Sequence, residues 1–137
     1  MSNEYPEGLR YTKDHEWARI DSSTASSTGG SLVTIGITGF AVESLGDITQ
    51  VDLPKEGETV SKDQVFGTVE SVKAVSDLFA PCSGKVVKVN DPLSDSPENV
   101  NDDPYDEGWM IQVEVTDLSE INALMDTAAY QAFLKDQ

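Results

Sequence analysis

The stretch that decides the fold is VFGTVESVKAVSDLFAP, which runs from Val65 to Pro81. Two apolar-rich runs, QVFGTVES and AVSDLFAP, lie on either side of one lysine, Lys73. Short runs rich in valine and phenylalanine, separated by a few residues, predict two antiparallel strands joined by a turn. We therefore expect Lys73 at or beside this turn, with its side chain projecting into water.

Two interpretations of Lys73 follow from this placement. An exposed lysine often protects an apolar hairpin from edge-to-edge association, and it then needs no further role. Alternatively the amine is itself the functional group, because a turn residue is accessible to other proteins. On geometry alone the protective role is the commoner one, so the choice between the two interpretations of Lys73 depends on evidence from other parts of the chain.

Alternation of apolar residues predicts further strands. The clearest are SLVTIGI at 31–37, a half-buried strand with Val33, Ile35 and Ile37 on one face, and GWMIQVEV at 108–115, with Trp109, Ile111, Val113 and Val115 on one face. Shorter candidates are YTKDHEWARI at 11–20, ITQVDLP at 48–54 and CSGKVVKVN at 82–90. The Ser/Thr/Gly tract at 21–31 is typical of a flexible hairpin loop. Many short strands with close turns predict a small antiparallel barrel or sandwich.

Helices are predicted from capping residues and from apolar residues at helical spacing. Thr38 is a candidate N-cap and Gly46 a candidate stop for a helix within 38–47. Ser96 is a candidate cap for the next helix, with Pro97 at its first position. Helical spacing also links Leu118, Ile121, Leu124 and Met125, preceded by Asp117 and Glu120 at capping-box spacing, and Thr127 is a candidate cap for Tyr130, Phe133 and Leu134. We expect these C-terminal helices to cover part of the β structure.

Composition limits the kinds of partner. The chain has 137 residues, with 9 basic and 25 acidic side chains and a formal net charge of -16. Nucleic acids and anionic membranes are bound by clustered Lys and Arg, so neither is an expected partner. The N-terminal residues lack the pattern of a secretory signal, and no window is apolar enough to span a membrane. We expect a bacterial-type cytoplasmic protein, with a processed organellar form as the alternative.

Few residues are suited to catalysis or metal binding. His15 is the only histidine and Cys82 the only cysteine, too few for a zinc site. Cys82 follows a proline in an apolar stretch and is interpreted as a small core residue. The acidic cluster at 91–108 lacks the residue order of an EF-hand loop. We therefore predict no catalytic residue and no metal site.

Motifs along nearly the whole chain resemble the glycine cleavage system H-protein family. They are YTKDHEWA, TIGITGFAVESLGDI, VDLPKEGE, GTVESVKAVSDLFAP followed by SGKVVKVN, DSPENVNDDPYDEGWM and AAYQAFL. Two features depart from the family pattern. The tract SSTASSTGG is longer than usual, and Gly39–Phe40 stands where Asp followed by an aromatic residue or His is commoner. Neither departure touches the lysine motif.

The resemblance implies a fold and a function. The fold is a mainly β barrel-sandwich hybrid of the lipoyl/biotinyl type with short helices, in a single domain 1–137 with its core at about 9–116. Lys73 would carry lipoate in an amide bond, attached by a lipoate ligase or lipoyl transferase. The chain would be a monomeric shuttle between glycine decarboxylase, which uses pyridoxal phosphate, a tetrahydrofolate-dependent aminomethyltransferase and dihydrolipoamide dehydrogenase.

The resemblance also implies two contacts to the loaded arm. The arm of the family folds into a surface cleft, where carboxylates shield the charged amine. The matching positions are Glu16 in HEWA and Asp77 in AVSDL. An ammonium beside a carboxylate is held by a charge-assisted hydrogen bond. His15 and Trp17 are expected to support the strand or pack on the barrel, with His15 lining the cleft as the alternative.

Four other functions stay open from the sequence. A biotin carboxyl carrier also has a lysine at a hairpin tip, but methionines normally flank it, where this chain has Val72 and Ala74. The chain could also relay lipoate to other complexes. It could be an interaction module with Lys73 unmodified. A hydrolase using His15 and nearby carboxylates is the remaining and least favoured alternative.

Overall fold

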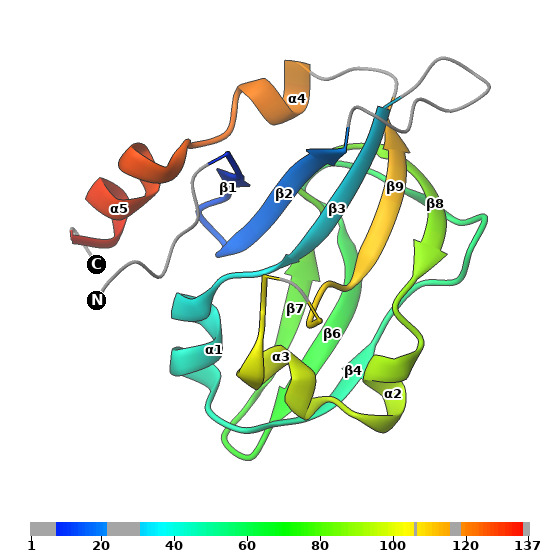
Figure 1. Cartoon of the computed structure of the whole chain (residues 1–137), viewed down its shortest axis with the longest axis vertical. Helices are drawn as coiled ribbons and strands as arrows, with labels where there is room; N and C mark the ends of the chain where they lie inside the picture. The colour runs from blue at the N-terminus through cyan, green and yellow to red at the C-terminus, as the bar shows by residue number, and fades with distance from the viewer. Residues whose placement is uncertain (1–7, 22–30, 106, 116–118, 136–137) are drawn as a thin grey trace.

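A computed structural model describes residues 8–21, 31–105, 107–115 and 119–135, which fold into two antiparallel β-sheets with short helices around them (Figure 1). The larger sheet has the strand order β1-β2-β3-β9-β8-β5 and the smaller one β4-β6-β7. The strands are β1 Arg10–Tyr11, β2 Glu16–Asp21, β3 Ser31–Ile37, β4 Ile48–Asp52, β5 Thr59–Val60, β6 Val65–Ser71, β7 Val75–Phe79, β8 Gly84–Val89 and β9 Ile111–Val115. The predicted mainly β fold is confirmed.

The helices are short and lie at the ends and edges of the sheets (Figure 1). They are α1 Gly39–Leu45, α2 Pro92–Asp95, α3 Glu98–Asp102, α4 Ser119–Asn122 and α5 Thr127–Lys135. Thr38 caps α1 by accepting a hydrogen bond from the Ala41 N–H, and Gly46 ends it at a φ of 82°. Both boundaries of α1 are as predicted. None of the helices in the described ranges is long and apolar enough to cross a membrane.

The β6–β7 hairpin forms where the opening stretch predicted it. The two strands pair antiparallel, with Glu70 opposite Val75 next to the turn. Their inner faces bury Phe66, Val69 and Leu78, which explains the regular apolar pattern. Because β7 is an edge strand, one side of its backbone has no strand neighbour among the described residues. The hairpin therefore leads from the core to an open turn that contains Lys73.

Strand β3 is buried on both faces, so the predicted half-buried strand is wrong in this respect. Val33, Ile35 and Ile37 lie in the main core as expected, but Thr34 is also buried. On the second face, the ring of Trp17 from β2 covers Gly36. A Cβ added at Gly36 would lie 2.7 Å from Trp17 Cε2. The absence of a side chain at Gly36 is what lets the indole pack on the sheet.

We expect Gly36→Ala to lower the free energy of unfolding by about 1–3 kcal/mol, because the new methyl group overpacks the Trp17 site. Urea denaturation followed by tryptophan fluorescence measures this change. Gly39→Ala is the matched control, since its Cβ would meet Tyr105 Oη at an ordinary 3.6 Å. Equal stabilities of the two variants would contradict the packing explanation.

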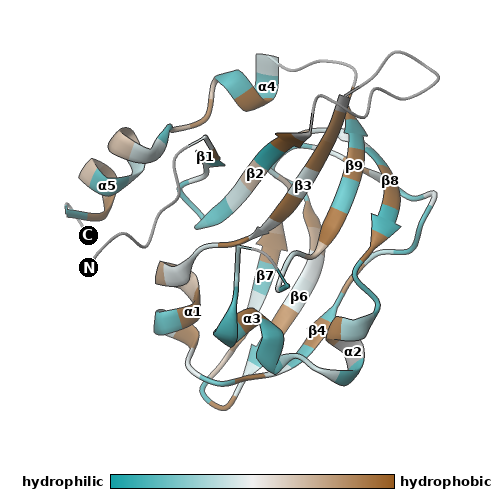
Figure 2. Cartoon of the chain, viewed as in Figure 1, coloured by the Kyte–Doolittle hydropathy of each residue, from teal (hydrophilic) through white to brown (hydrophobic). Residues whose placement is uncertain are grey.

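A second apolar cluster attaches the C-terminal helix to the sheet. It contains Leu9, Tyr11, Trp17 and Tyr130, apart from the main core. The rings of Tyr11 on β1 and Tyr130 on α5 stack at 4.6 Å. Figure 2 shows α5 as a helix of mixed hydropathy beside β1, which suits a helix with one buried face. The predicted packing of a C-terminal helix on the β structure is confirmed.

Several predicted boundaries are wrong. The stretch 11–20 is two strands rather than one, because a turn with His15 at a φ of 70° interrupts it. Ser96 ends α2 and Pro97 precedes α3, so the cap is one residue later than predicted. Trp109 precedes β9 and is only partly buried, whereas the neighbouring Met110 is fully buried.

The C-terminal caps also differ from the prediction. Asp126 rather than Thr127 caps α5, since its carboxylate accepts a hydrogen bond from the Ala129 N–H at 2.8 Å. Met125 forms a β-bridge with Tyr11 instead of continuing a helix. The Asp117 half of the predicted capping box and most of the Ser/Thr/Gly loop, residues 22–30, lie outside the described residues.

Candidate functional site

The lysine turn, residues 71–74, is shaped by the hydroxyl group of Ser71. Ser71 Oγ accepts hydrogen bonds from the backbone N–H of Lys73 at 3.2 Å and of Ala74 at 3.1 Å. The Ser71 N–H donates to the Ala74 carbonyl oxygen at 2.8 Å. Serine hydroxyls commonly form such local bonds, which fix a tight turn without help from its other side chains. The turn is therefore rigid while the lysine side chain takes no part in it.

Lys73 is exposed at the apex of this turn. Its neighbours are exposed as well, with Val72 at 70% and Val75 at 66% of their full accessibility. Within the part of the chain that the structure describes, the Lys73 amine makes no salt bridge or hydrogen bond. A lysine so placed is accessible to an enzyme that acylates it, and its loss of charge would break no internal contact.

Glu16, the first expected arm contact, is buried beneath the surface with 1% of its area exposed. Its Oε1 accepts a hydrogen bond from Thr12 Oγ1 at 2.7 Å, and its Oε2 accepts one from the Phe79 N–H at 3.0 Å. The second bond satisfies a donor of edge strand β7 and joins the two sheets. Burial raises the pKa of this carboxyl to about 8, against the two hydrogen bonds, which lower it.

Asp77, the second expected arm contact, is exposed on β7. It lies two residues before Phe79, the strand residue that donates to Glu16, and four residues after Lys73. Asp77 therefore lies between the lysine turn and Phe79 along the hairpin, so of the two expected arm contacts it is nearer to Lys73 in the sequence.

Cys82 and His15, the only cysteine and the only histidine of the sequence, both pack against other parts of the fold. Cys82 is fully buried, as expected for a core residue, and burial raises the pKa of its thiol to about 12. His15 Nδ1 lies 2.8 Å from Tyr130 Oη, and the His15 ring packs on Phe40 with centroids 4.5 Å apart. Burial lowers the pKa of His15, while Asp14 raises it. No group of metal-binding side chains occurs in the described residues.

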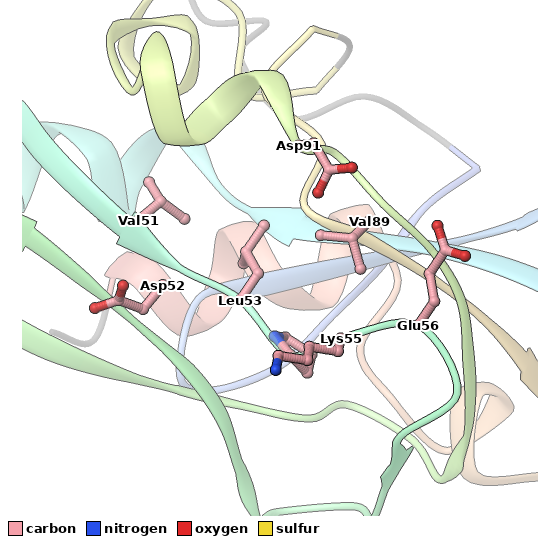
Figure 3. Close-up of a pocket in the computed structure, with 8 residues that line it drawn as sticks. Val51, Asp52, Leu53, Lys55, Glu56, Val89 and Asp91 are labelled. Carbon is pink, nitrogen blue, oxygen red and sulfur yellow. The ribbon is translucent and has the colours of Figure 1, made fainter.

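A cavity of about 390 Å³ lies between the end of β4 and the start of α2 (Figure 3). Its polar lining consists of Asp52, Lys55, Glu56 and Asp91. Lys73, Glu16, Asp77, His15 and Cys82 do not line it. The cavity therefore does not belong to the lysine site.

An exposed lysine at the apex of a hairpin in a two-sheet β fold is the arrangement expected of a carrier domain, the class of protein that bears its cofactor on a lysine arm. The model of the glycine cleavage H-protein family matches residues 9–137. The chain belongs to this family, whose members are the non-catalytic, lipoyl-bearing aminomethyl carriers of the glycine cleavage system.

Individual relatives agree with the family model. A glycine cleavage system H protein of Anaeromyxobacter sp. (strain K) is 56% identical over 134 residues, 98% of each chain. One from Myxococcus xanthus is 48% identical over 136 residues, 99% of each chain. A crystal structure of a glycine cleavage system H protein from Mycobacterium marinum has a TM-score of 0.82 at 42% identity, covering 95% of this chain and 98% of that one.

The sequence did not indicate that Gly46 and Asp47, between α1 and β4, contact the lysine turn. The carbonyl oxygen of Asp47 accepts a hydrogen bond from the Val72 N–H at 3.2 Å. Gly46 lies so close to the Lys73 side chain that a Cβ there would be 3.3 Å from Lys73 Cε. The only sequence signal at this place was Gly46 as a helix stop, which says nothing about a contact with a distant lysine.

Proposed function

We propose that Lys73 is the residue of this carrier that bears the lipoyl group. The exposed, unpaired amine on a rigid turn carries this assignment. The fit is chemical as well as steric, because a lysine amine can attack the carbonyl carbon of an acyl-adenylate. The ammonium first gives up one proton to become a nucleophilic amine; the amide C–N bond then forms, the acyl–phosphate bond breaks, AMP leaves, and the nitrogen loses a second proton. The lysine charge disappears in this step.

The chain supplies a support and a set of docking surfaces rather than reacting groups. When bound, the lipoyl group provides a disulfide that accepts the aminomethyl group and that is later re-formed from the dithiol. As the carrier of the system, the chain visits glycine decarboxylase, the aminomethyltransferase and dihydrolipoamide dehydrogenase. A fixed turn with an exposed arm suits this task, because one amine must enter several different active sites.

Lipoylated and unmodified protein, compared with purified glycine decarboxylase, test this function. We expect glycine-dependent exchange of labelled bicarbonate with the lipoylated chain only. Exchange at the same rate with the unmodified chain would reject the lipoyl carrier. If the intact mass of protein made in cells showed biotin in place of lipoate, the biotin carboxyl carrier would be supported instead.

We further propose that the loaded arm contacts the Asp77 carboxylate on β7 before it reaches the Phe79–Glu16 contact. A lipoyl-lysine is about as long as four residues of extended chain, roughly 13–14 Å. Asp77 lies on β7, four residues after Lys73 in the turn, and thus at most about 13 Å away along the chain. The Phe79–Glu16 contact lies about 7 Å further, and both Glu16 oxygens already accept hydrogen bonds. Glu16 would thus shield the arm only after Asp77 and only by giving up one of these bonds.

Asp77→Asn is expected to speed the loss of ammonia from the aminomethyl-loaded protein about two- to fivefold, the effect of removing one exposed ion pair. Ammonia release from purified loaded protein in the absence of the transferase measures this rate. Asp91→Asn, another exposed carboxylate outside the lysine hairpin, is the matched control. Equal rates in the two variants would reject the Asp77 contact.

The remaining expectations concern the state of the protein. We propose that it acts in the bacterial cytoplasm as a monomer, because a shuttle has to leave each enzyme freely. We also propose that the chain forms one domain, since α5 packs directly on β1 and Ile121 of α4 lies in the main core. Sedimentation of the lipoylated protein measures the monomeric state.

A further inference from the structure

The direction of the lysine turn depends on the two residues between α1 and β4. The Asp47 carbonyl oxygen accepts a hydrogen bond from the Val72 N–H, and Gly46 faces Lys73 Cε. The hydrogen bonds of Ser71 Oγ lie within the turn and fix its shape, whereas its orientation on the body depends on the Asp47–Val72 bond and on the adjoining pairing of Ser71 with Ile48 of β4. The Gly46–Asp47 segment is the part of the body that the turn contacts through both backbone and lysine side chain.

This segment is itself held by one side chain, that of Asn101 on α3. Asn101 Nδ2 donates a hydrogen bond to the Gly46 carbonyl oxygen at 2.9 Å. Asn101 Oδ1 accepts one from the Ile48 N–H, also at 2.9 Å. The amide thus brackets Asp47 from both sides. An amide has the donor and the acceptor that these two backbone groups require, and a carboxylate of the same shape lacks the donor.

We propose that Asn101 is a positioning residue for Lys73, which acts through Gly46 and Asp47 to hold the lysine turn in the orientation that the acylating enzyme needs. The inference rests on the proposed attachment of lipoate to Lys73. An amine that must reach an acyl-adenylate in a partner active site reacts faster when its support is already oriented. Asn101 is not a catalytic residue, because it does not touch the amine.

Asn101→Asp tests the proposal, with Asn90→Asp as the matched control. Asn90 Nδ2 also donates to backbone carbonyls, of Glu107 at 2.9 Å and of Trp109 at 2.7 Å, but it does not hold the Gly46–Asp47 segment. Each protein is incubated with lipoate, ATP and a lipoate ligase below its unfolding temperature, and acylation of Lys73 is followed by mass. We expect kcat/KM to fall about three- to tenfold for Asn101→Asp, the effect of losing one hydrogen bond, and less than about twofold for Asn90→Asp.

Amide hydrogen exchange distinguishes positioning from a general loss of stability. In Asn101→Asp the Val72 N–H, which bonds to Asp47, should exchange about tenfold faster relative to the Ser71 N–H, which bonds within the turn. The same acceleration at both amides would overturn the proposal, and so would equal kcat/KM values for the two variants. If Asn101→Asp does not fold, Asn101→Ser removes both bonds without adding a charge.

Failure of the attachment hypothesis gives a different result. In that case the natural chain itself would remain unmodified at Lys73 in the ligase assay, whatever residue stands at position 101. Normal modification of the natural chain together with unchanged Asn101 variants would overturn the positioning role alone.

Discussion

Arginine in place of Lys73 will abolish glycine-dependent bicarbonate exchange, reducing it to the level measured without carrier. The guanidinium group keeps its proton at every physiological pH and is delocalised, so it does not attack an acyl-adenylate. The fold should not change. Lys73 is exposed and makes no salt bridge among the described residues, so the free energy of unfolding should stay within about 0.5 kcal/mol of the natural value.

Lys85→Arg is the matched control, because Lys85 is also an exposed lysine and lies near the start of strand β8. It should retain full exchange. Residual exchange in Lys73→Arg above the background, with protein shown to be folded by circular dichroism, would mean that another residue carries the arm.

The second large effect concerns the pH dependence of stability. The pKa of Glu16 is about 8 in the folded chain and 4.5 for an unperturbed glutamate. Between these values the folded state holds a proton that the unfolded state releases, so stability is lost as the pH rises. A pKa difference of one between the two states corresponds to about 1.4 kcal/mol, so the loss amounts to a few kcal/mol. Above about pH 8 this contribution becomes constant.

Glu16→Gln removes the titrating group and nearly preserves its shape. We expect the free energy of unfolding of the natural protein, relative to this variant, to fall by a few kcal/mol between about pH 4.5 and 8. Urea denaturation at intervals across this range measures the difference, in which the other titrating groups cancel. Glu43→Gln, at an exposed position of α1, is the control and should show no such slope.

If the difference in free energy of unfolding between the natural protein and Glu16→Gln does not change between about pH 4.5 and 8, Glu16 stays ionised in the folded protein. The hydrogen bonds from Thr12 and Phe79 would then outweigh the cost of burying the charge. In that event Glu16 would carry a permanent negative charge below β7, and its proposed role toward a cationic arm would become stronger.

The hairpin that bears Lys73 could be predicted from the sequence because its signal is local. Two runs rich in apolar residues flank a short turn, and the paired residues Glu70 and Val75 are only five positions apart. The caps of α1 were predictable for the same reason, since Thr38 bonds to a residue three positions later. Local hydrogen bonds and periodicity are visible in a single sequence.

The surroundings of the site could not be predicted, because they depend on contacts between distant segments. Glu16 was expected to contact the loaded arm, and its burial against the Phe79 N–H, 63 residues away on edge strand β7, has no signal in the sequence around it. Gly36 looked like part of an alternating strand, and only the Trp17 ring explains its burial. Asn101 occurs in the acidic cluster at 91–108, where nothing in the sequence indicates a contact with Gly46.

The most direct test is a peptide map of protein produced in cells supplied with lipoate. The structure and the family predict one lipoyl amide, on the peptide that contains Lys73, and unmodified peptides for Lys62, Lys85 and Lys88. A lipoyl or biotinyl group on any other lysine, or a fully unmodified Lys73 beside a lipoylated control carrier from the same cells, would contradict them.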